Sequence, residues 1–113
     1  MSREDTRAWE PKPLLFALGL CAKARRLTCG VPMICDSLSA HPKPAVVIAA
    51  ADNAKNSAKR LADKCAFYGV RLVTVPISGE ELAHAVGKTG HLAALAVTDE
   101  QMAVLVQKNL PEQ

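Results

Sequence analysis

The sequence predicts a three-layer α/β/α sandwich, in which helices cover both faces of a four-stranded sheet. Segments with helical spacing of apolar residues alternate with short apolar runs, which gives the order α-β-α-β-α-β-α-β-α. The run at 45–51, AVVIAAA, contains no polar residue and is typical of a strand buried on both faces. A chain of 113 residues is long enough for one domain and leaves little for a second.

Residues 1–11 are polar and mixed in charge, and we expect a flexible N-terminal arm there, followed by a single domain at 12–113. Pro13 then opens the first helix, because proline fits the first helical turn. Gly19 within this helix predicts close approach by a neighbouring element. The apolar residues at helical spacing are Leu14, Leu15, Leu18 and Cys21.

A short strand at 26–29 precedes the second helix, with Gly30 between them and Pro32 where the helix begins. We expect the apolar face of this helix to consist of Met33, Ile34 and Leu38. The buried strand at 45–51 follows.

The third helix has the clearest amphipathic pattern in the chain. Asp52 and Asn53 are residue types that begin helices, and Gly69 is a natural C-terminal stop. A strand at 70–75 follows. The expected buried stripe of the helix consists of Ala54, Ala58, Leu61, Ala62 and Cys65.

Two segments have the spacing of a capping box, and each predicts the start of a helix. The first, Ser78 to Glu81, opens a short helix that ends near Val86. The second, Thr98 to Gln101, opens the last helix. Between them lie a loop at 87–90 and a strand at 92–97.

Composition excludes several classes of protein. Hydrophobic residues make up 50% and charged residues 22%, which are globular values. Aromatic residues are only 4%, too few for a stacking platform for single-stranded nucleic acid. No apolar run approaches the ~20 residues needed to span a bilayer, and the N-terminal segment does not have the pattern of a signal peptide. We therefore expect a cytoplasmic protein that has no membrane partner.

Nothing in the sequence matches a common catalytic or metal-binding motif. Phosphate loops, dinucleotide fingerprints and nucleophile elbows are absent, and the cysteines and histidines form no close ligand pairs. Cys29 and Cys35 flank the start of the second helix, whose dipole would stabilise a thiolate, although small buried thiols are far commoner. We therefore expect reduced thiols and no enzyme activity, metal, cofactor or small-molecule substrate.

The net charge of +3 is unevenly distributed. The first thirty residues carry six basic and three acidic side chains, whereas residues 67–113 carry three basic and five acidic ones. Such a modest basic excess is compatible with a surface for a polyanion, but charge alone favours the solubility of an ordinary globular domain.

Three segments have residues suited to binding. They are the basic stretch that leads into the second helix, the start of the third helix, and the loop before the last strand. Helix N-termini present unpaired amides and a positive dipole end, which attract phosphates and base edges. If these turns meet at one edge of the sheet, they form a surface suited to folded RNA. The alternative is that they are only turns.

Three strings carry a resemblance to a known family. They are LGLCAKARRLTCG at 18–30, AVVIAAADNAKNSAKRLADKCAFYGV at 45–70 and ELAHAVGKTGHLAALAVTDE at 81–100. Together they resemble the L7Ae/L30e superfamily of ribosomal proteins, in particular its small bacterial members. The resemblance implies an α/β/α sandwich with a mixed four-stranded sheet. It also implies recognition of kink-turns, which are sharply bent internal loops in RNA.

The resemblance also implies where RNA would bind. In this superfamily the start of the second helix docks against sheared G·A pairs, and the loop before the last strand packs on bases. The ribosomal members carry an Asn-Glu pair and then a Lys where this chain has Pro32, Met33 and Asp36, so we expect phosphate contacts to replace base contacts. The implied RNA-binding residues are Lys23, Arg25, Arg26, Gly30, Val31, Pro32, Asn53, Lys55, Lys88, Thr89 and Gly90.

The predicted function is that of a non-catalytic RNA-binding protein, ribosomal or ribosome-associated, which binds structured RNA as a monomer. One alternative is a protein-interaction module on the same fold, with Pro32, Met33 and Ile34 as an apolar contact patch. Exposed Met33 and Ile34 would favour that alternative, and a buried Met33 in a positive surface would disfavour it. A thiol enzyme is the third hypothesis.

Overall fold

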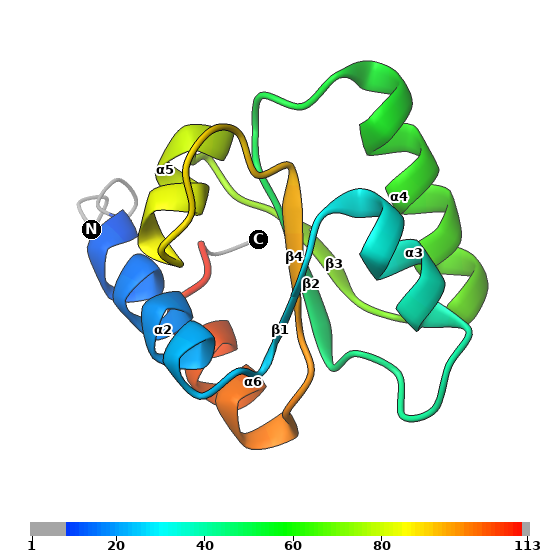
Figure 1. Cartoon of the computed structure of the whole chain (residues 1–113), viewed down its shortest axis with the longest axis horizontal. Coiled ribbons are helices and arrows are strands. Elements are labelled where there is room, and N and C mark those ends of the chain that lie inside the picture. The colour runs from blue at the N-terminus through cyan, green and yellow to red at the C-terminus, as the bar shows by residue number, and fades with distance from the viewer. Residues whose placement is uncertain (1–8, 112–113) are drawn as a thin grey trace, which may run out of the picture.

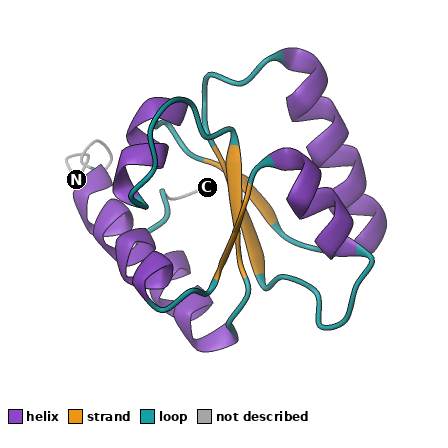
Figure 2. Cartoon of the chain, in the orientation of Figure 1, coloured by secondary structure: helices purple, strands orange, loops and turns teal. Residues whose placement is uncertain are grey.

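The structure of the chain, a computed structural model, describes residues 9–111. Helices and strands alternate along this part of the chain, as the sequence predicts (Figures 1 and 2). The helices are α2 (Pro11–Lys23), α3 (Val31–Leu38), α4 (Lys55–Tyr68), α5 (Gly79–Ala85) and α6 (Glu100–Lys108). The strands are β1 (Leu27–Cys29), β2 (Val46–Ala49), β3 (Leu72–Thr74) and β4 (Ala94–Val97), each shorter than its predicted segment.

The sheet is mixed and has the order β1-β4-β2-β3. β4 runs antiparallel to β1 and β2, and β2 runs parallel to β3. Consequently Cys29, Ala49 and Thr74, the last residues of three strands, lie at the same end of the sheet as Ala94, the first residue of β4. We call this the α3 end, because α3 begins there (Figure 1).

Helices cover both faces of the sheet, which confirms the three-layer prediction (Figure 2). On β2, Val46 and Ile48 point to the layer of α2, α5 and α6, whereas Val47 and Ala49 point to the layer of α3 and α4. All four residues are buried, as expected for a strand with both faces covered. Among residues 9–111, no helix has the length and apolar character that crossing a bilayer requires.

The first helix begins at Pro11 rather than at Pro13. The Trp9 indole Nε1 donates to the Asn109 carbonyl at 2.9 Å, and its ring packs against the core. Trp9 and Pro11 are therefore held against the domain and do not belong to a loose arm, whereas the rest of the predicted arm, residues 1–8, lies outside the described residues. The prediction for Gly19 is confirmed, because a Cβ there would lie 3.1 Å from the carbonyl oxygen of Ala85 on α5.

The apolar face of α3 is shifted from its predicted position. Met33 is 60% exposed, whereas Ile34 is fully buried. The helix begins directly after Gly30, so its buried residues recur at helical spacing from Val31: Val31, Ile34, Cys35 and Leu38. The prediction that Met33 belongs to the apolar face is wrong, because at about 3.6 residues per turn it lies off the side that these four residues share.

Two predicted helix starts are also wrong. The residue that precedes α4 is Ala54, which provides no side-chain cap, and Asp52 and Asn53 make other bonds. The cap of α6 is Asp99, not Thr98: its Oδ2 accepts from the Met102 amide at 2.9 Å. Ser78 is confirmed as the cap of α5, because its Oγ accepts from the Glu81 amide at 3.1 Å.

The buried stripe of α4 is narrower than predicted. Only Leu61 and Cys65 are buried among its described residues, and Ala54, Ala58 and Ala62 are exposed. α4 packs beside α3 on one face of the sheet, and its alanines at 58 and 62 face solvent. The apolar pattern in the sequence therefore predicts a wider buried face than α4 has.

Candidate nucleic-acid interface

The start of α3, the start of α4 and the loop before β4 meet at the α3 end of the sheet. The Gly30 amide donates to the Ala94 carbonyl at 3.0 Å, which joins the start of α3 to the start of β4. The Ala50 amide donates to the Ala93 carbonyl at 2.9 Å, which joins the β2–α4 turn to the same strand. The loop that precedes β4 reaches the same end of the sheet (Figure 1). The turns of the three predicted segments therefore cluster at one end of the sheet, whereas the basic stretch at 23–26 does not.

The first turn of α3 presents backbone, not charge. Gly30 has φ 94° and ψ 142°, a conformation that residues with a Cβ rarely adopt, and no side chain caps the helix. Val31 is buried, so it can offer a ligand only its amide. Pro32 and Met33 are exposed and uncharged. The free amides and the positive end of the helix dipole can receive an anionic or polar group.

A groove runs from this turn along β1. Its volume is about 460 Å³. We call it the β1 groove; its lining residues are Ala22, Arg25, Leu27, Thr28, Cys29, Met33, Val86 and Lys88. Arg25 follows α2 and Lys88 follows α5, so the fold brings two cations from distant parts of the chain to one groove beside the start of α3.

Arg25 occupies a backbone position that favours glycine. Its φ is 60°, in the left-handed region. The Arg25 amide donates to the Ala22 carbonyl at 3.0 Å, and the Arg26 amide donates to the Cys21 carbonyl at 2.9 Å. These two bonds form a Schellman motif, in which the left-handed residue is usually glycine. A non-glycine residue there costs about 1–2 kcal/mol.

The rest of the basic stretch lies elsewhere. The Arg26 carbonyl accepts from the Thr98 amide at 2.9 Å, which places Arg26 at the sheet end opposite α3. Lys23 ends α2 on the same side and, like Arg26, is not among the residues that line the β1 groove. The structure thus separates Lys23 and Arg26 from the predicted surface. Lys55 is exposed at the first position of α4, at the α3 end.

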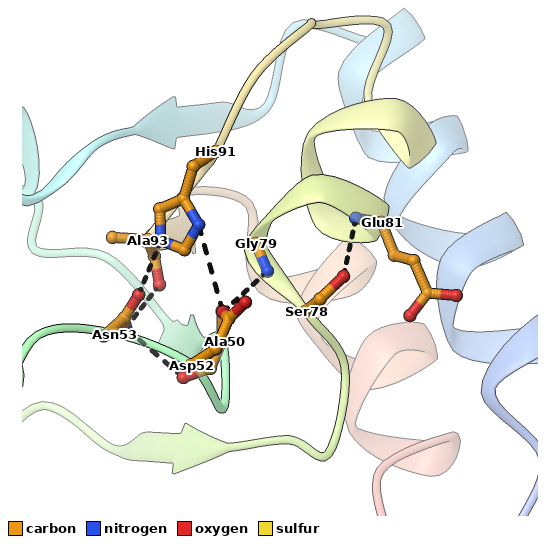
Figure 3. Close-up of polar contacts among 8 residues, drawn as sticks. All are labelled: Ala50, Asp52, Asn53, Ser78, Gly79, Glu81, His91 and Ala93. Atoms are coloured by element: carbon orange, nitrogen blue, oxygen red, sulfur yellow. Dashed lines mark hydrogen bonds and ion pairs between the residues drawn. The ribbon is translucent and has the colours of Figure 1, made fainter.

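Asn53, predicted to contact RNA, is occupied by internal bonds (Figure 3). Its Nδ2 donates to the Ala93 carbonyl at 2.9 Å and to the Ala50 carbonyl at 3.3 Å. Its Oδ1 lies 3.1 Å from the Nε2 of His91. We therefore remove Asn53 from the RNA-contact set, because its amide joins the β2–α4 turn to the segment before β4.

His91 connects the loop before β4 to two other elements (Figure 3). Its Nδ1 lies 3.9 Å from the Oδ1 of Asp52, and that oxygen accepts from the Gly79 amide at 2.9 Å. The ring lies against α5, because a Cβ at Gly79 would come within 2.3 Å of it. Asp52, Gly79 and His91 were not predicted as site residues from the sequence. Their contacts fix the base of the loop that carries Lys88, Thr89 and Gly90.

We expect Gly79→Ala to destabilise the domain by about 1–2 kcal/mol, because the His91 ring must leave its place and give up its hydrogen bond with Asn53. In a His91→Ala background the same substitution should cost nothing or stabilise, since alanine favours a helix over glycine. Urea denaturation of the unchanged protein, the two single variants and the double variant measures the cost of Gly79→Ala in each background. An equal cost in both backgrounds would show that the ring does not occupy this space.

The environment of three cysteine thiols disfavours the thiolate form that a nucleophile requires. Burial raises the pKa of Cys29, and the nearby charge of Lys88 opposes only part of that effect. Burial also raises the pKa values of Cys21 and Cys65. A thiol with a raised pKa is neutral near pH 7 and reacts slowly. Within residues 9–111, no group of three or more His, Cys, Asp or Glu side chains could hold a metal ion.

The fold and this surface define a class of protein: a small α/β/α sandwich that presents a helix N-terminus, two cations and a fixed loop along one groove beside β1. The sequence profile described as "Ribosomal protein L7Ae/L30e/S12e/Gadd45 family" matches residues 14–106, and the chain belongs to this family. The resemblance inferred from the sequence is thereby confirmed. No curated protein matches the sequence.

Two solved structures are similar to this one. A protein of unknown function from Bacillus halodurans is 28% identical, with a TM-score of 0.72 over 83% of this chain and 96% of that chain. The Giardia lamblia 15.5 kD RNA-binding protein is 20% identical, with a TM-score of 0.70 over 96% of this chain and 91% of that chain. At that identity the second structure shows a common fold.

Proposed function

We propose that the chain is a non-catalytic, cytoplasmic RNA-binding protein, ribosomal or ribosome-associated, which binds kink-turn-like RNA as a monomer. The observation that carries this proposal is the convergence of Arg25 and Lys88 on one groove beside the uncapped start of α3. Membership in a family named for ribosomal proteins supports it. The name of the Giardia lamblia relative, an RNA-binding protein of the same fold, agrees with it.

The chemistry of the surface favours recognition of RNA shape. Arg25 and Lys88 can contact phosphates on the two sides of a narrow bend, and the amides of α3 can bind a phosphate or a base edge between them. Pro32 and Met33 supply no side-chain hydrogen bond to a base. Affinity should therefore depend strongly on salt, and sequence should matter chiefly through its effect on RNA folding.

A protein-interaction module is the second candidate, and one observation favours it. Met33 is 60% exposed beside the exposed Pro32, as an apolar contact patch requires. However, Ile34 is fully buried, so the predicted patch loses one of its three members. Two cations share the groove that Met33 lines, and this arrangement fits a polyanion better than an apolar partner surface.

The proposal is tested by titrating the protein against a standard kink-turn RNA and against the same RNA with its G·A pairs replaced, each at two salt concentrations. We expect tight, salt-sensitive binding to the intact RNA and weaker binding to the replaced one. Equal binding to both would contradict kink-turn recognition and leave general RNA binding. Absence of binding to either RNA at micromolar protein would contradict the proposal and favour the protein-interaction module.

Arg25→Gly should have opposite effects on stability and binding. Glycine relieves the left-handed strain, so the free energy of unfolding should rise by about 0.5–1 kcal/mol after allowance for the more flexible unfolded chain. RNA affinity should fall about tenfold, since the substitution removes one charged group from the groove. Thermal denaturation and RNA titration measure the two effects.

Arg26→Gly is the matched control, because the neighbouring arginine lies outside the groove and is not among the residues with positive φ. It should destabilise the domain slightly and leave affinity nearly unchanged. If the two variants behave alike, Arg25 has no special role in binding.

A further inference from the structure

α4 carries as much net positive charge as the whole chain. Its 14 residues include four basic side chains and one acidic one, a net charge of +3, which is also the net charge of the full sequence. The acidic side chain, Asp63, is paired with Lys59 at 2.9 Å on the helix surface. Arg60 and Lys64 are exposed, and within residues 9–111 neither forms an ion pair. The charges of these two residues can therefore meet a phosphate.

Arg60, Lys64 and Phe67 lie along one side of α4. Their spacing of four and then three residues is that of neighbours on a helix surface, and all three side chains are exposed. We call these three residues the α4 strip. A helix rises about 1.5 Å per residue, so Arg60 and Lys64 are separated by about 6 Å along the axis. This separation is similar to the spacing of successive phosphates in an extended strand.

Phe67 is 80% exposed, yet its ring is held in place on the surface. It lies nearly perpendicular to the ring of Tyr68, with centroids 4.9 Å apart and an interplanar angle of 86°. Tyr68 packs against the core in the layer of α3 and α4. The Lys43 Nζ donates to the Tyr68 carbonyl at 2.9 Å and lies 5.8 Å from the centroid of its ring. Phe67 thus presents one oriented aromatic ring, which is enough to stack a single base.

The α4 strip leads away from the proposed RNA surface. β2 and β3 are parallel, so α4, which connects them, runs from the α3 end to the opposite end of the sheet (Figure 1). Its first residue, Lys55, is exposed at the α3 end, and Phe67 lies near its other end. An RNA strand that leaves the folded element at the α3 end can follow α4 for about 20 Å. This continuity favours RNA over an acidic protein segment as the occupant.

We propose that the α4 strip binds an unpaired strand that flanks the folded part of the RNA, with phosphates on Arg60 and Lys64 and one base stacked on Phe67. This inference rests on the proposed function and adds a second contact region to it. Stacking on an aromatic ring accepts every base, so the strip should favour an unpaired flank without selecting its sequence. An RNA that has no unpaired flank should not contact the strip.

The experiment compares a kink-turn RNA with the same RNA extended by about ten unpaired nucleotides, placed at the 5′ end in one RNA and at the 3′ end in another. At least one extended RNA should bind about tenfold tighter or more, since it adds a base–aromatic stack and two phosphate contacts. For that RNA, the slope of log K against log salt should be steeper by about 0.7 for each new phosphate contact. A 5-iodouracil in the extension should cross-link to Phe67 or Tyr68 on irradiation.

Two variants test the strip. Phe67→Ala should lose most of the gain in affinity that the extension gives, and so should Arg60→Gln with Lys64→Gln. Both variants should bind the unextended RNA nearly as the unchanged protein does. All three side chains are exposed, so the variants should fold normally, and circular dichroism confirms that they do.

Each variant has a matched control on the other side of the sheet. Val104 is 59% exposed on α6, so Val104→Ala removes exposed apolar surface outside the strip. Lys12→Gln with Lys108→Gln removes the same charge as the double variant, and both lysines are exposed on α2 and α6. Both controls should keep the full gain from the extension.

The possible failures are distinguishable. If the protein binds the extended and unextended RNAs equally, the strip proposal is overturned, the proposed function stands, and an acidic protein segment becomes the better occupant. If the extension strengthens binding but the strip variants keep that gain, the extension binds elsewhere and the proposal is again overturned. If the unchanged protein binds none of the RNAs, the proposed function itself fails.

Discussion

Reversal of both charges in the β1 groove, Arg25→Glu with Lys88→Glu, should reduce affinity for a kink-turn RNA by at least about a hundredfold. Each charged hydrogen bond contributes roughly 1.5–3 kcal/mol, and the new carboxylates repel phosphate. The slope of log K against log salt should become shallower by about 0.7–0.9 for each phosphate that the protein no longer neutralises. Titrations at four salt concentrations give both quantities.

The matched control is Lys12→Glu with Lys108→Glu. Both lysines are exposed and lie outside the β1 groove. Their double substitution changes the net charge by the same amount as Arg25→Glu with Lys88→Glu. This control should lose only the small part of the affinity that depends on overall charge. If it loses as much as the groove variant, binding follows net charge and the β1 groove is not the site.

Ile34→Ala should destabilise the domain by about 2–4 kcal/mol, because truncation of a fully buried side chain in the layer of α3 and α4 leaves a cavity. α3 begins at the proposed RNA surface and is short, so the same variant should also weaken RNA binding by loosening its first turn. Urea denaturation measures the loss of stability, and binding is measured well below the unfolding midpoint.

The neighbouring substitution, Met33→Ala, should change stability by less than about 0.5 kcal/mol, since Met33 is 60% exposed. Comparison of the two adjacent positions therefore tests the register of α3. Similar decreases in stability at both positions would mean that α3 is rotated from the orientation described above.

The fold was largely predictable from the sequence because its strongest signals are local. The apolar run at 45–51 and the alternation of helical and strand patterns depend only on nearby residues. Burial of all four residues of β2 followed from that run. The clustering of the start of α3, the start of α4 and the loop before β4 was only one of two interpretations of the sequence, because alternating elements can place their turns at either end of the sheet.

The errors arose where the partner of a residue is far along the chain. Asp52 and Asn53 are typical helix-start residues, but they bond to Gly79 and Ala93, which no local pattern connects to them. Met33 was misplaced because, at about 3.6 residues per turn, it lies off the face that Val31, Ile34, Cys35 and Leu38 share. The left-handed backbone of Arg25 has no sequence signal, since that position usually carries glycine.

The central claim is that RNA binds at the α3 end of the sheet. Nuclear magnetic resonance of the isotopically labelled protein tests it most directly, by following the backbone amides as kink-turn RNA is added. The largest shifts should fall on Arg25, Gly30, Val31, Met33 and residues 87–91, with little change at the end of α4 or along α6. Shifts that cluster at the opposite end of the sheet, or none while the RNA is bound, would contradict the claim.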